Sequence, residues 1–346
     1  MVAFTGGVHA SASDLPSDRI ETLASVRDDL GPPAPAEPLD FTVVGIGGGG
    51  CNVVHRVFQS GLPTGRLWAL NTDAQHLYSV KAHHKMLLGR NLCRGRSANS
   101  DPRVGEMAAE EARLELSSAF RGARLAFLIA SLGGGTGSGA APVVAKVARE
   151  ERVTTVALAA LPFTVEGSVR TAAARNSLDR LRAHADFVSP FPNDRLLTEH
   201  PGLSFRDALM RADDELFRPV HALSRAACRE DSSPLRRRLR RARFSGAASA
   251  TATRQRGYPH AAEAALASLS HLSLHFPNAA VVTVGTSGDL APHDRDAILR
   301  LALEAVRPNG SILWGYYHDP ALKGLCEVSV FLARTDSREE PAPNSS

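Results

Sequence analysis

From residue 41 onward, short and nearly continuous hydrophobic runs alternate with amphipathic stretches. Such runs are typical of parallel strands that are covered on both faces, and the stretches between them place Ala, Leu and Val at helical spacing. Helices are predicted over 104–120 and 139–152. Strands are predicted from the runs that begin at Phe41, Leu67, Lys85, Leu125 and Val153. The pattern predicts a doubly wound α/β domain, with a parallel sheet whose ligands bind at the carboxyl ends of the strands.

A second and smaller α/β domain is predicted beyond a long connecting helix. A Ser/Ala/Thr-rich stretch at 244–253 follows that helix, and the alternation resumes past residue 260. There we expect a helix that runs to Leu272, another over 292–306, and strands that begin at Ala280, Ser311 and Glu327. The expected divisions are a flexible N-terminal arm at 1–39, a nucleotide-binding domain at 40–203, the connecting helix at 204–228, the second domain at 229–334 and a disordered tail at 335–346. The only element expected in the arm is a short helix over 18–30.

Composition narrows the class of protein further. No apolar run approaches the roughly 20 residues that a membrane helix needs, so we expect a cytoplasmic protein that is not integral to a membrane. The four cysteines lack paired spacing and are expected to be reduced and isolated, and no metal site is predicted from side chains. An arginine run at 236–243 is either a solvated helix face or a binder of an anionic patch. Because no aromatics are interleaved with it, nucleic acid is not favoured as a partner.

A glycine-rich loop, 45–50, follows the first predicted strand and precedes a helix. Glycines allow a tight turn and a close backbone approach, while a helix N-terminus directs unpaired amides at phosphate. Taken alone, this loop fits a dinucleotide site or a simple glycine-rich turn.

A second glycine loop, 133–139, also lies between a strand and a helix and reads GGGTGSG. Two phosphate cradles at the ends of separate strands, with Thr136 and Ser138 able to donate hydroxyls, indicate a bound triphosphate. A nicotinamide-binding domain has no use for the second cradle.

The sequence GGGTGSG resembles the signature of the tubulin and FtsZ superfamily. The segments GIGGGGCN, ALNTDAQHL, LPFTVEGSVR and PNDRLL also resemble FtsZ, over 41–216 and again over 280–333, and two of them lean toward the archaeal group. The resemblance implies a GTP-binding GTPase that polymerises head to tail and acts in cell division, at the division site. It implies GTP or GDP as the bound nucleotide, with Mg²⁺ carried through the phosphates.

The resemblance also implies roles for particular residues. Phosphate contacts would come from Gly47, Gly48, Gly49, Asn52, Gly133, Gly134, Gly135, Thr136 and Gly137. Asn71 and Asp73 would lie near the phosphates and Mg²⁺, Glu166 would hold the ribose, and Arg170 would reach phosphate or sugar. Asn193 and Asp213 would read guanine, because a carboxylate can accept both the N1 and the N2 protons. Taken singly, these four last residues also fit surface acids, a turn former and a helix-face cation.

The chain departs from the family pattern at several positions. Cys51 stands where glycine or asparagine is usual, the loop 95–100 reads GRSANS in place of GLGAGG, and Leu209 replaces an aromatic that stacks on guanine. Losing that stacking would lower nucleotide affinity.

The largest departure concerns hydrolysis. The family's water-positioning loop, usually NxDxxD and contributed by the next subunit, matches 229–234 here, with Asp231 at the first acid and Pro234 at the second. Proline cannot polarise water, so weak GTP hydrolysis is expected, with Asp231 as the remaining catalytic residue. The alternative is a non-hydrolysing regulator that binds another FtsZ. A Rossmann-type oxidoreductase is a third reading that rests on the first loop alone.

Overall fold

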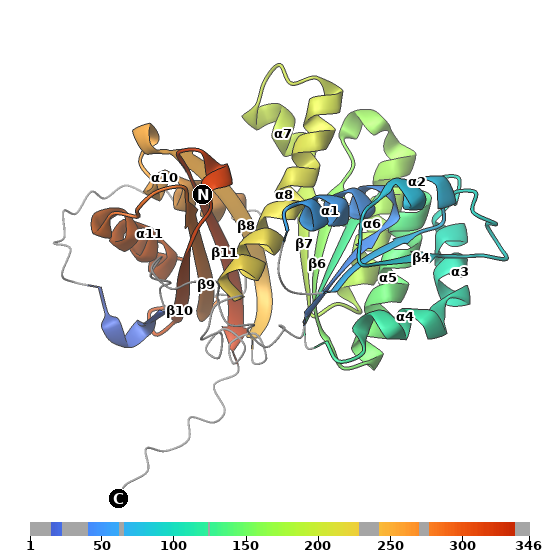
Figure 1. Cartoon of the computed structure of the whole chain (residues 1–346), viewed down its shortest axis with the longest axis horizontal. Coiled ribbons are helices and arrows are strands. Elements are labelled where there is room, and N and C mark those ends of the chain that lie inside the picture. Colours follow the sequence, from blue (N-terminus) through green and yellow to red (C-terminus); the bar gives the residue numbers. More distant parts are fainter. Residues whose placement is uncertain are drawn as a thin grey trace, which may run out of the picture.

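The computed structural model describes residues 15–22, 41–61, 66–123, 125–227, 242–269 and 277–335. Two sheets lie on either side of one long helix, α8 (Phe205–Ala227), as Figure 1 shows. The helix occupies the place where the sequence predicted a connecting helix.

The first sheet contains six parallel strands within the described residues, in the order β4-β3-β2-β5-β6-β7. Their bounds are β2 Phe41–Ile46, β3 Arg66–Asn71, β4 His84–Leu87, β5 Leu125–Ser131, β6 Thr154–Leu161 and β7 Phe187–Pro192. The chain moves outward from β2 to β4 and then returns to β5, so the strand order reverses between β2 and β5. The predicted doubly wound domain is therefore confirmed, and its switch point is where such sheets bind ligands.

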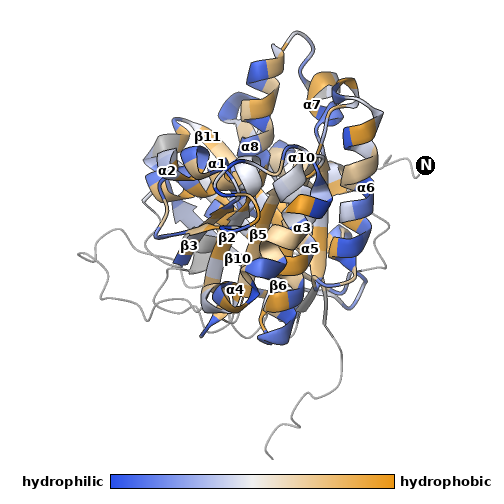
Figure 2. Ribbon diagram, turned by 90° about the vertical axis from the view of Figure 1, so that its right-hand side faces the viewer, coloured by the Kyte–Doolittle hydropathy of each residue, from blue (hydrophilic) through white to orange (hydrophobic). Residues whose placement is uncertain are grey.

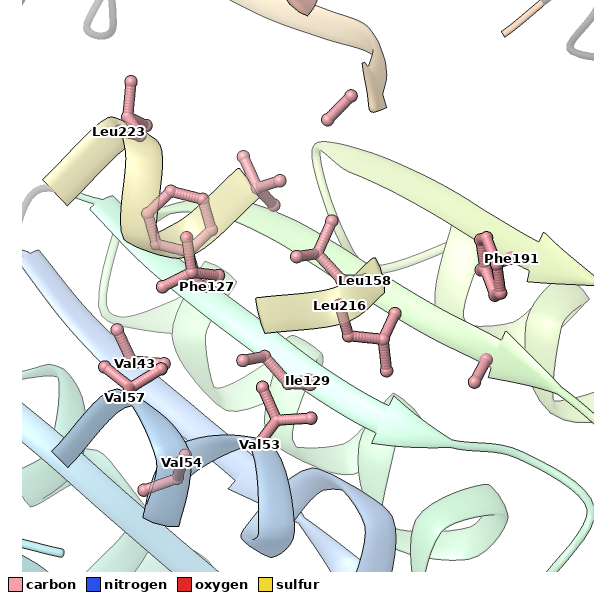
Figure 3. Packing of buried hydrophobic residues seen from close by; sticks show 14 of the residues in the cluster. Val43, Val53, Val54, Val57, Phe127, Ile129, Leu158, Phe191, Leu216 and Leu223 are labelled. Carbon is pink, nitrogen blue, oxygen red and sulfur yellow. The ribbon is translucent and has the colours of Figure 1, made fainter. Parts of the chain in front are cut away.

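Helices cover both faces of this sheet because its strands are hydrophobic on both sides. On β5, Phe127 and Ile129 face α1 and α8, whereas Ala126 and Leu128 face the opposite layer, which includes α5. Figure 3 shows the first of these clusters, and Figure 2 shows hydrophobic colour on α5. The helices are α1 Gly47–Gln59, α2 Ala74–Ser79, α3 Pro102–Glu111, α4 Arg113–Phe120, α5 Gly135–Glu150, η2 Thr164–Glu166, α6 Ser168–Arg182 and α7 Asp194–Glu199.

The second sheet has five described strands in the order β1-β10-β9-β11-β8, and β11 runs antiparallel to both of its neighbours. One face packs on α8, through residues such as Val281 and Phe331, and the other packs on α10 and α11. The strands are β1 Ile20–Thr22, β8 Ala242–Thr253, β9 Ala279–Thr286, β10 Ser311–His318 and β11 Leu325–Thr335. The helical segments are η1 Ser17–Arg19, η3 Arg254–Arg256, α10 Pro259–Leu269, α11 Pro292–Glu304 and η4 Pro320–Leu322.

The N-terminal arm was wrongly expected to contain a helix that begins at residue 18. Instead, Ile20–Thr22 forms β1 along the edge of β10. The guanidinium of Arg19 fixes the segment by donating to the carbonyl oxygens of Gly310 (2.7 Å) and Arg307 (3.2 Å). Pairing with residues nearly 300 positions away overrides the local helical pattern. Residues 1–14 and 23–40 and the tail after residue 335 lie outside the described residues.

Two other expectations need correction. The helix predicted over 104–120 is two helices, because the backbone at Ala112 leaves the helical region (φ −90°, ψ 8°). The small residues at 244–253, for which no element was expected, belong to β8, which pairs with β11 along its whole length. Strand β7 was also not predicted.

Within the described ranges, no helix has the length and apolar character needed to cross a membrane. Cys51, Cys93 and Cys326 are buried free thiols, as expected, and Cys228 lies outside the described residues.

A buried carboxyl group lies between the second sheet and α8. Glu327 on β11 is only 5% exposed and accepts a hydrogen bond from the Tyr317 hydroxyl (3.3 Å). Burial raises the pKa of Glu327 to about 7; the carboxylates of Asp319 and Glu215 add to the rise, while Arg218 and the Tyr317 hydrogen bond oppose it. A carboxyl group whose pKa is higher in the folded protein than in the unfolded protein stabilises the fold at pH values below the unfolded-state pKa. This contribution is lost as the pH rises through the folded-state pKa.

Replacing Glu327 with Gln is therefore expected to make stability less dependent on pH. The wild-type free energy of unfolding should fall, relative to that of Glu327→Gln, by up to about 3 kcal/mol between pH 4.5 and pH 8. Urea unfolding of both proteins at each pH measures the difference. Parallel curves would show that Glu327 does not titrate in this window.

Candidate nucleotide-binding site

A cleft of about 450 Å³ opens at the carboxyl ends of the first sheet's strands, beside the switch point. This volume suits a small-molecule ligand. Every predicted binding residue lines it except Gly47 and Gly133, which form the turns of the two glycine loops. The predicted catalytic Asp231 lies outside the described residues.

The two glycine loops touch each other through their backbones. A Cβ atom on Gly47 would lie 2.8 Å from the amide nitrogen of Gly137, and one on Gly137 would lie 2.3 Å from the carbonyl oxygen of Ser131. A Cβ on Gly49 would lie 2.0 Å from Ser131 Oγ. Gly47 also has a φ of +72°, which disfavours any side chain. These three positions therefore require glycine, and their contact sets the distance between the loops.

The second loop is fixed by hydrogen bonds as well. The amide of Gly133 (φ +99°) donates to the buried hydroxyl of Ser138 at 2.7 Å, and Ser177 donates to the Ser138 carbonyl oxygen at 2.7 Å. Arg170 Nε approaches the Gly133 carbonyl oxygen at 3.4 Å. The loop is thus held in one shape without a ligand.

Helices α1 and α5 both begin at the cleft. Within the described residues, neither has a side-chain cap or an acidic residue in its first turn. The first amides of each helix lack intrahelical partners and carry the positive end of the helix dipole. Two such N-termini facing one cleft form a site for a polyanion.

A buried pair of hydroxyls joins the second glycine loop to the loop at 97–100. Thr72 Oγ1 lies 2.6 Å from Thr136 Oγ1 and accepts a hydrogen bond from the Ala98 amide at 3.0 Å. The divergent segment GRSANS is therefore tied to the second glycine loop, and its residues 97–100 line the cleft. The part played by Thr72 was not predicted.

On the side of α8, the cleft offers acceptor groups. Asn193, in the turn after β7, is 6% exposed, and its Oδ1 has no hydrogen-bond partner among the residues that the structure describes. Asp213 of α8 lines the same cleft, and burial raises its pKa to about 6; Asp214 adds to the rise, while Arg56 and a hydrogen bond from Asn52 oppose it. An unpaired buried acceptor beside a carboxylate suits a ligand with several N–H donors. Leu209 also lies at this side.

Glu166 and Arg170 form a pair at the rim, with Arg170 Nη1 2.8 Å from Glu166 Oε2. The other carboxylate oxygen of Glu166 accepts from the Phe163 amide at 2.8 Å. The Arg170 side chain is 47% exposed and the Glu166 side chain 12%, so only the arginine can swing freely toward a ligand.

Two polar residues that line the cleft, His76 and Ser131, lie outside both the predicted set and the loop at 95–100. His76 lies five positions after Asn71 in the segment NTDAQHL, and Ser131 directly precedes the second glycine loop. Ser131 could have been found from its position at the end of β5. His76 could not, because its ring contacts depend on how α1, β3 and α2 meet.

Taken together, the sheet and the paired loops define a nucleoside-triphosphate-binding protein with two helix N-termini at one phosphate site. A profile described as "Tubulin/FtsZ family, GTPase domain" matches residues 40–200. Cell division protein FtsZ 1 of Archaeoglobus fulgidus is 35% identical over 304 residues, covering 85% of this chain and 82% of that protein. Cell division protein FtsZ 1 of Pyrococcus furiosus is also 35% identical, covering 87% and 83%. The chain belongs to the tubulin/FtsZ family and carries its GTPase domain.

The solved structures agree with this assignment. An empty FtsZ dimer from M. jannaschii superposes with a TM-score of 0.79 at 28% identity, covering 90% of this chain and 96% of that one. This protein is accordingly an FtsZ-like GTP-binding protein.

Two alanine substitutions should separate the packing of the cradle from its contact with the nucleotide. Gly137→Ala forces a Cβ against backbone, so both the melting temperature and GTP affinity should fall. At Gly48, which lines the cleft, a Cβ would meet no described atom within 4 Å. Gly48→Ala should therefore keep the wild-type melting temperature while GTP binds more weakly, as measured by thermal unfolding and calorimetry. Wild-type affinity in Gly48→Ala would contradict phosphate contact at this position.

Proposed function

We propose that this protein binds GTP in the cleft and polymerises head to tail into filaments that act in cell division, with weak GTP hydrolysis at the subunit interface. The observation that carries the proposal is the interlocked pair of glycine turns, with the acceptors Asn193 and Asp213 in the same cleft. The relatives' names support the division role, and the structural neighbour described as an FtsZ dimer supports self-association.

In the proposed complex, the phosphates lie on the amides at the starts of α1 and α5, with Asn52 and Thr136 beside them. Asn71 and Asp73 line the same cleft, and their oxygen atoms suit a hydrated Mg²⁺ that arrives with the phosphates. Glu166 holds the ribose, and Arg170 turns to phosphate or sugar. Asn193 and Asp213 accept the guanine N–H groups, an arrangement that adenine cannot satisfy.

Hydrolysis would be completed by the next subunit in the filament, because a head-to-tail contact brings one subunit's loop to its neighbour's nucleotide. The matching loop here keeps Asp231 but has Pro234 at the second acid. Losing one positioned catalytic group typically lowers a rate by a factor of ~10² to 10⁴. Turnover is therefore proposed to be slow while nucleotide binding persists.

The rival proposal is a non-hydrolysing regulator that joins filaments of another FtsZ. The proline in the acid loop and the arginine run at 236–243 favour it. Sedimentation of the purified chain with GTP, GDP or no nucleotide, with released phosphate measured in the same tubes, separates the two. Pelleting with GTP and slow phosphate release support self-assembly; pelleting only when a second FtsZ is added supports the regulator, and a typical family turnover rate contradicts weak hydrolysis.

Restoring the second acid should increase turnover. Pro234→Asp is expected to raise the rate of phosphate release per pelleted subunit by about tenfold or more, and Asp231→Asn should lower it, with GTP affinity unchanged in both. Steady-state phosphate release and equilibrium binding provide the two readouts. If phosphate release by Pro234→Asp were no faster than that of the wild type, position 234 would not be the place of the missing acid.

The affinity for GTP should fall in acid, because only ionised Asp213 accepts both guanine protons. With a pKa of about 6, the carboxylate is mostly ionised at pH 7 and mostly protonated at pH 5, so affinity should fall about tenfold between these values. Calorimetric titration at both pH values measures the change. Asp213→Asn should bind GTP weakly at both pH values, without this pH dependence. If the affinity of Asp213→Asn fell between pH 7 and pH 5 as much as that of the wild type, another group would be responsible for the effect.

A further inference from the structure

The ring of His76, on α2, lies between the amide side chains of Asn71 and Asn52. Its Nδ1 lies 3.2 Å from Asn71 Nδ2, at the end of β3, and its Nε2 lies 3.0 Å from Asn52 Oδ1 on α1. All three residues line the cleft. Neither the predicted site nor the proposed function assigns His76 a part.

The hydrogen bonds around the ring fix its tautomer. Asn71 Oδ1 accepts from the Thr72 amide at 2.9 Å, so the Asn71 amide group turns its N–H toward His76. Nδ1 of the ring must then be the acceptor, which leaves the proton on Nε2, where it is donated to Asn52 Oδ1. The tautomer of the His76 ring is therefore set, through Asn71, by the backbone at Thr72.

The chain of donors continues to the α8 side of the cleft. Because Asn52 Oδ1 accepts from His76, the Asn52 amide nitrogen is the donor that reaches Asp213. The three hydrogen bonds run in one direction: Asn71 donates to His76, His76 donates to Asn52, and Asn52 donates to the carboxylate of Asp213. Reversing one amide would set two donors or two acceptors against each other, so the side chains hold each other's orientation.

We propose that His76 is a positioning residue that couples the guanine-reading carboxylate Asp213 to the phosphate-side residue Asn71 through this directional chain. The proposal rests on the proposed function, since it assumes that GTP lies across these groups. Loss of His76 should weaken recognition at both ends of the nucleotide together, although its side chain is assigned no contact with the reacting atoms.

The alternative, that the His76 side chain serves only to stabilise the fold, does not agree with its contacts. The start of α2 is capped by Asp73, which accepts from the backbone amide of His76 at 3.0 Å, and this bond does not need the ring. The hydrophobic contact of the short helix α2 is made by Leu77, which is buried, whereas His76 is only half-buried. Replacing the ring should leave the fold intact.

The test compares His76→Gln with His76→Leu. Glutamine offers an acceptor and a donor on one planar group and can restore both links, whereas leucine has similar bulk and no polar atom. Calorimetry gives two ratios for each protein. The affinity for GTP over ITP, which lacks the exocyclic amine, reports the guanine end, and the affinity for GTP over GMP reports the phosphate end.

We expect His76→Leu to lower both ratios roughly fivefold, the effect of about one hydrogen bond at each end. His76→Gln should keep both ratios near wild type, and thermal unfolding without nucleotide should be the same for all three proteins. If His76→Leu unfolds early, His76→Ala takes its place. Unchanged ratios in the apolar variant, a change at one end alone, or an equal loss in His76→Gln would overturn the coupling. A wild-type protein that does not bind GTP would instead overturn the proposed function.

Discussion

The site depends on one backbone contact, in which the turn at Gly47 lies against the turn at Gly137. Two helix N-termini can face one phosphate chain only if the turns that precede them approach more closely than side chains allow. The neighbouring strands β2 and β5 bring the turns together. Because Gly47 and Gly137 have no Cβ atoms, the two backbones can come into direct contact. Ser131 lies against both loops and so fixes their separation. The amides are thereby arranged before any ligand arrives, which reduces the entropy lost on binding.

Helix α8 connects this cleft to the second sheet. Its first half carries Asp213 and Leu209, which line the cleft. Its later turns bury Val220 and Leu223 in the hydrophobic cluster that includes residues of both sheets, and Figure 3 labels Leu223. Because the interior is closely packed, a displacement of α8 at the nucleotide requires repacking against both sheets. Asp213, which is proposed to read guanine, therefore belongs to the same rigid element that holds the two halves of the protein together.

Much of the fold could be predicted from the sequence because its signals are local. Central strands such as β2 and β5 are hydrophobic on both faces, and glycine runs mark both phosphate turns. Strand β8 is built from Ala, Ser and Thr, and it is a strand because β11 pairs with it. Strand β1 likewise exists through its pairing with β10. These elements depend on partners that are distant in the sequence, which no local pattern encodes.

The candidate site likewise contains residues that could be predicted from the sequence and residues that could not. Its glycines could be predicted from their spacing, and its polar residues from the resemblance to FtsZ. Thr72 and His76 could not, since each is defined by which atoms face it after folding. The hydroxyl of Thr72 meets Thr136 only because β3 ends beside the start of α5. Hydrogen-bond direction is a property of the assembled structure.

The joined turns and the acceptors beside them are proposed to hold one guanine nucleotide. Isothermal titration of the purified chain with GTP and with ATP tests this proposal. We expect one GTP per chain and an ATP affinity at least about a hundredfold weaker, because adenine leaves the buried acceptors unpaired. No heat of binding with GTP, or equal affinities for the two nucleotides, would contradict it.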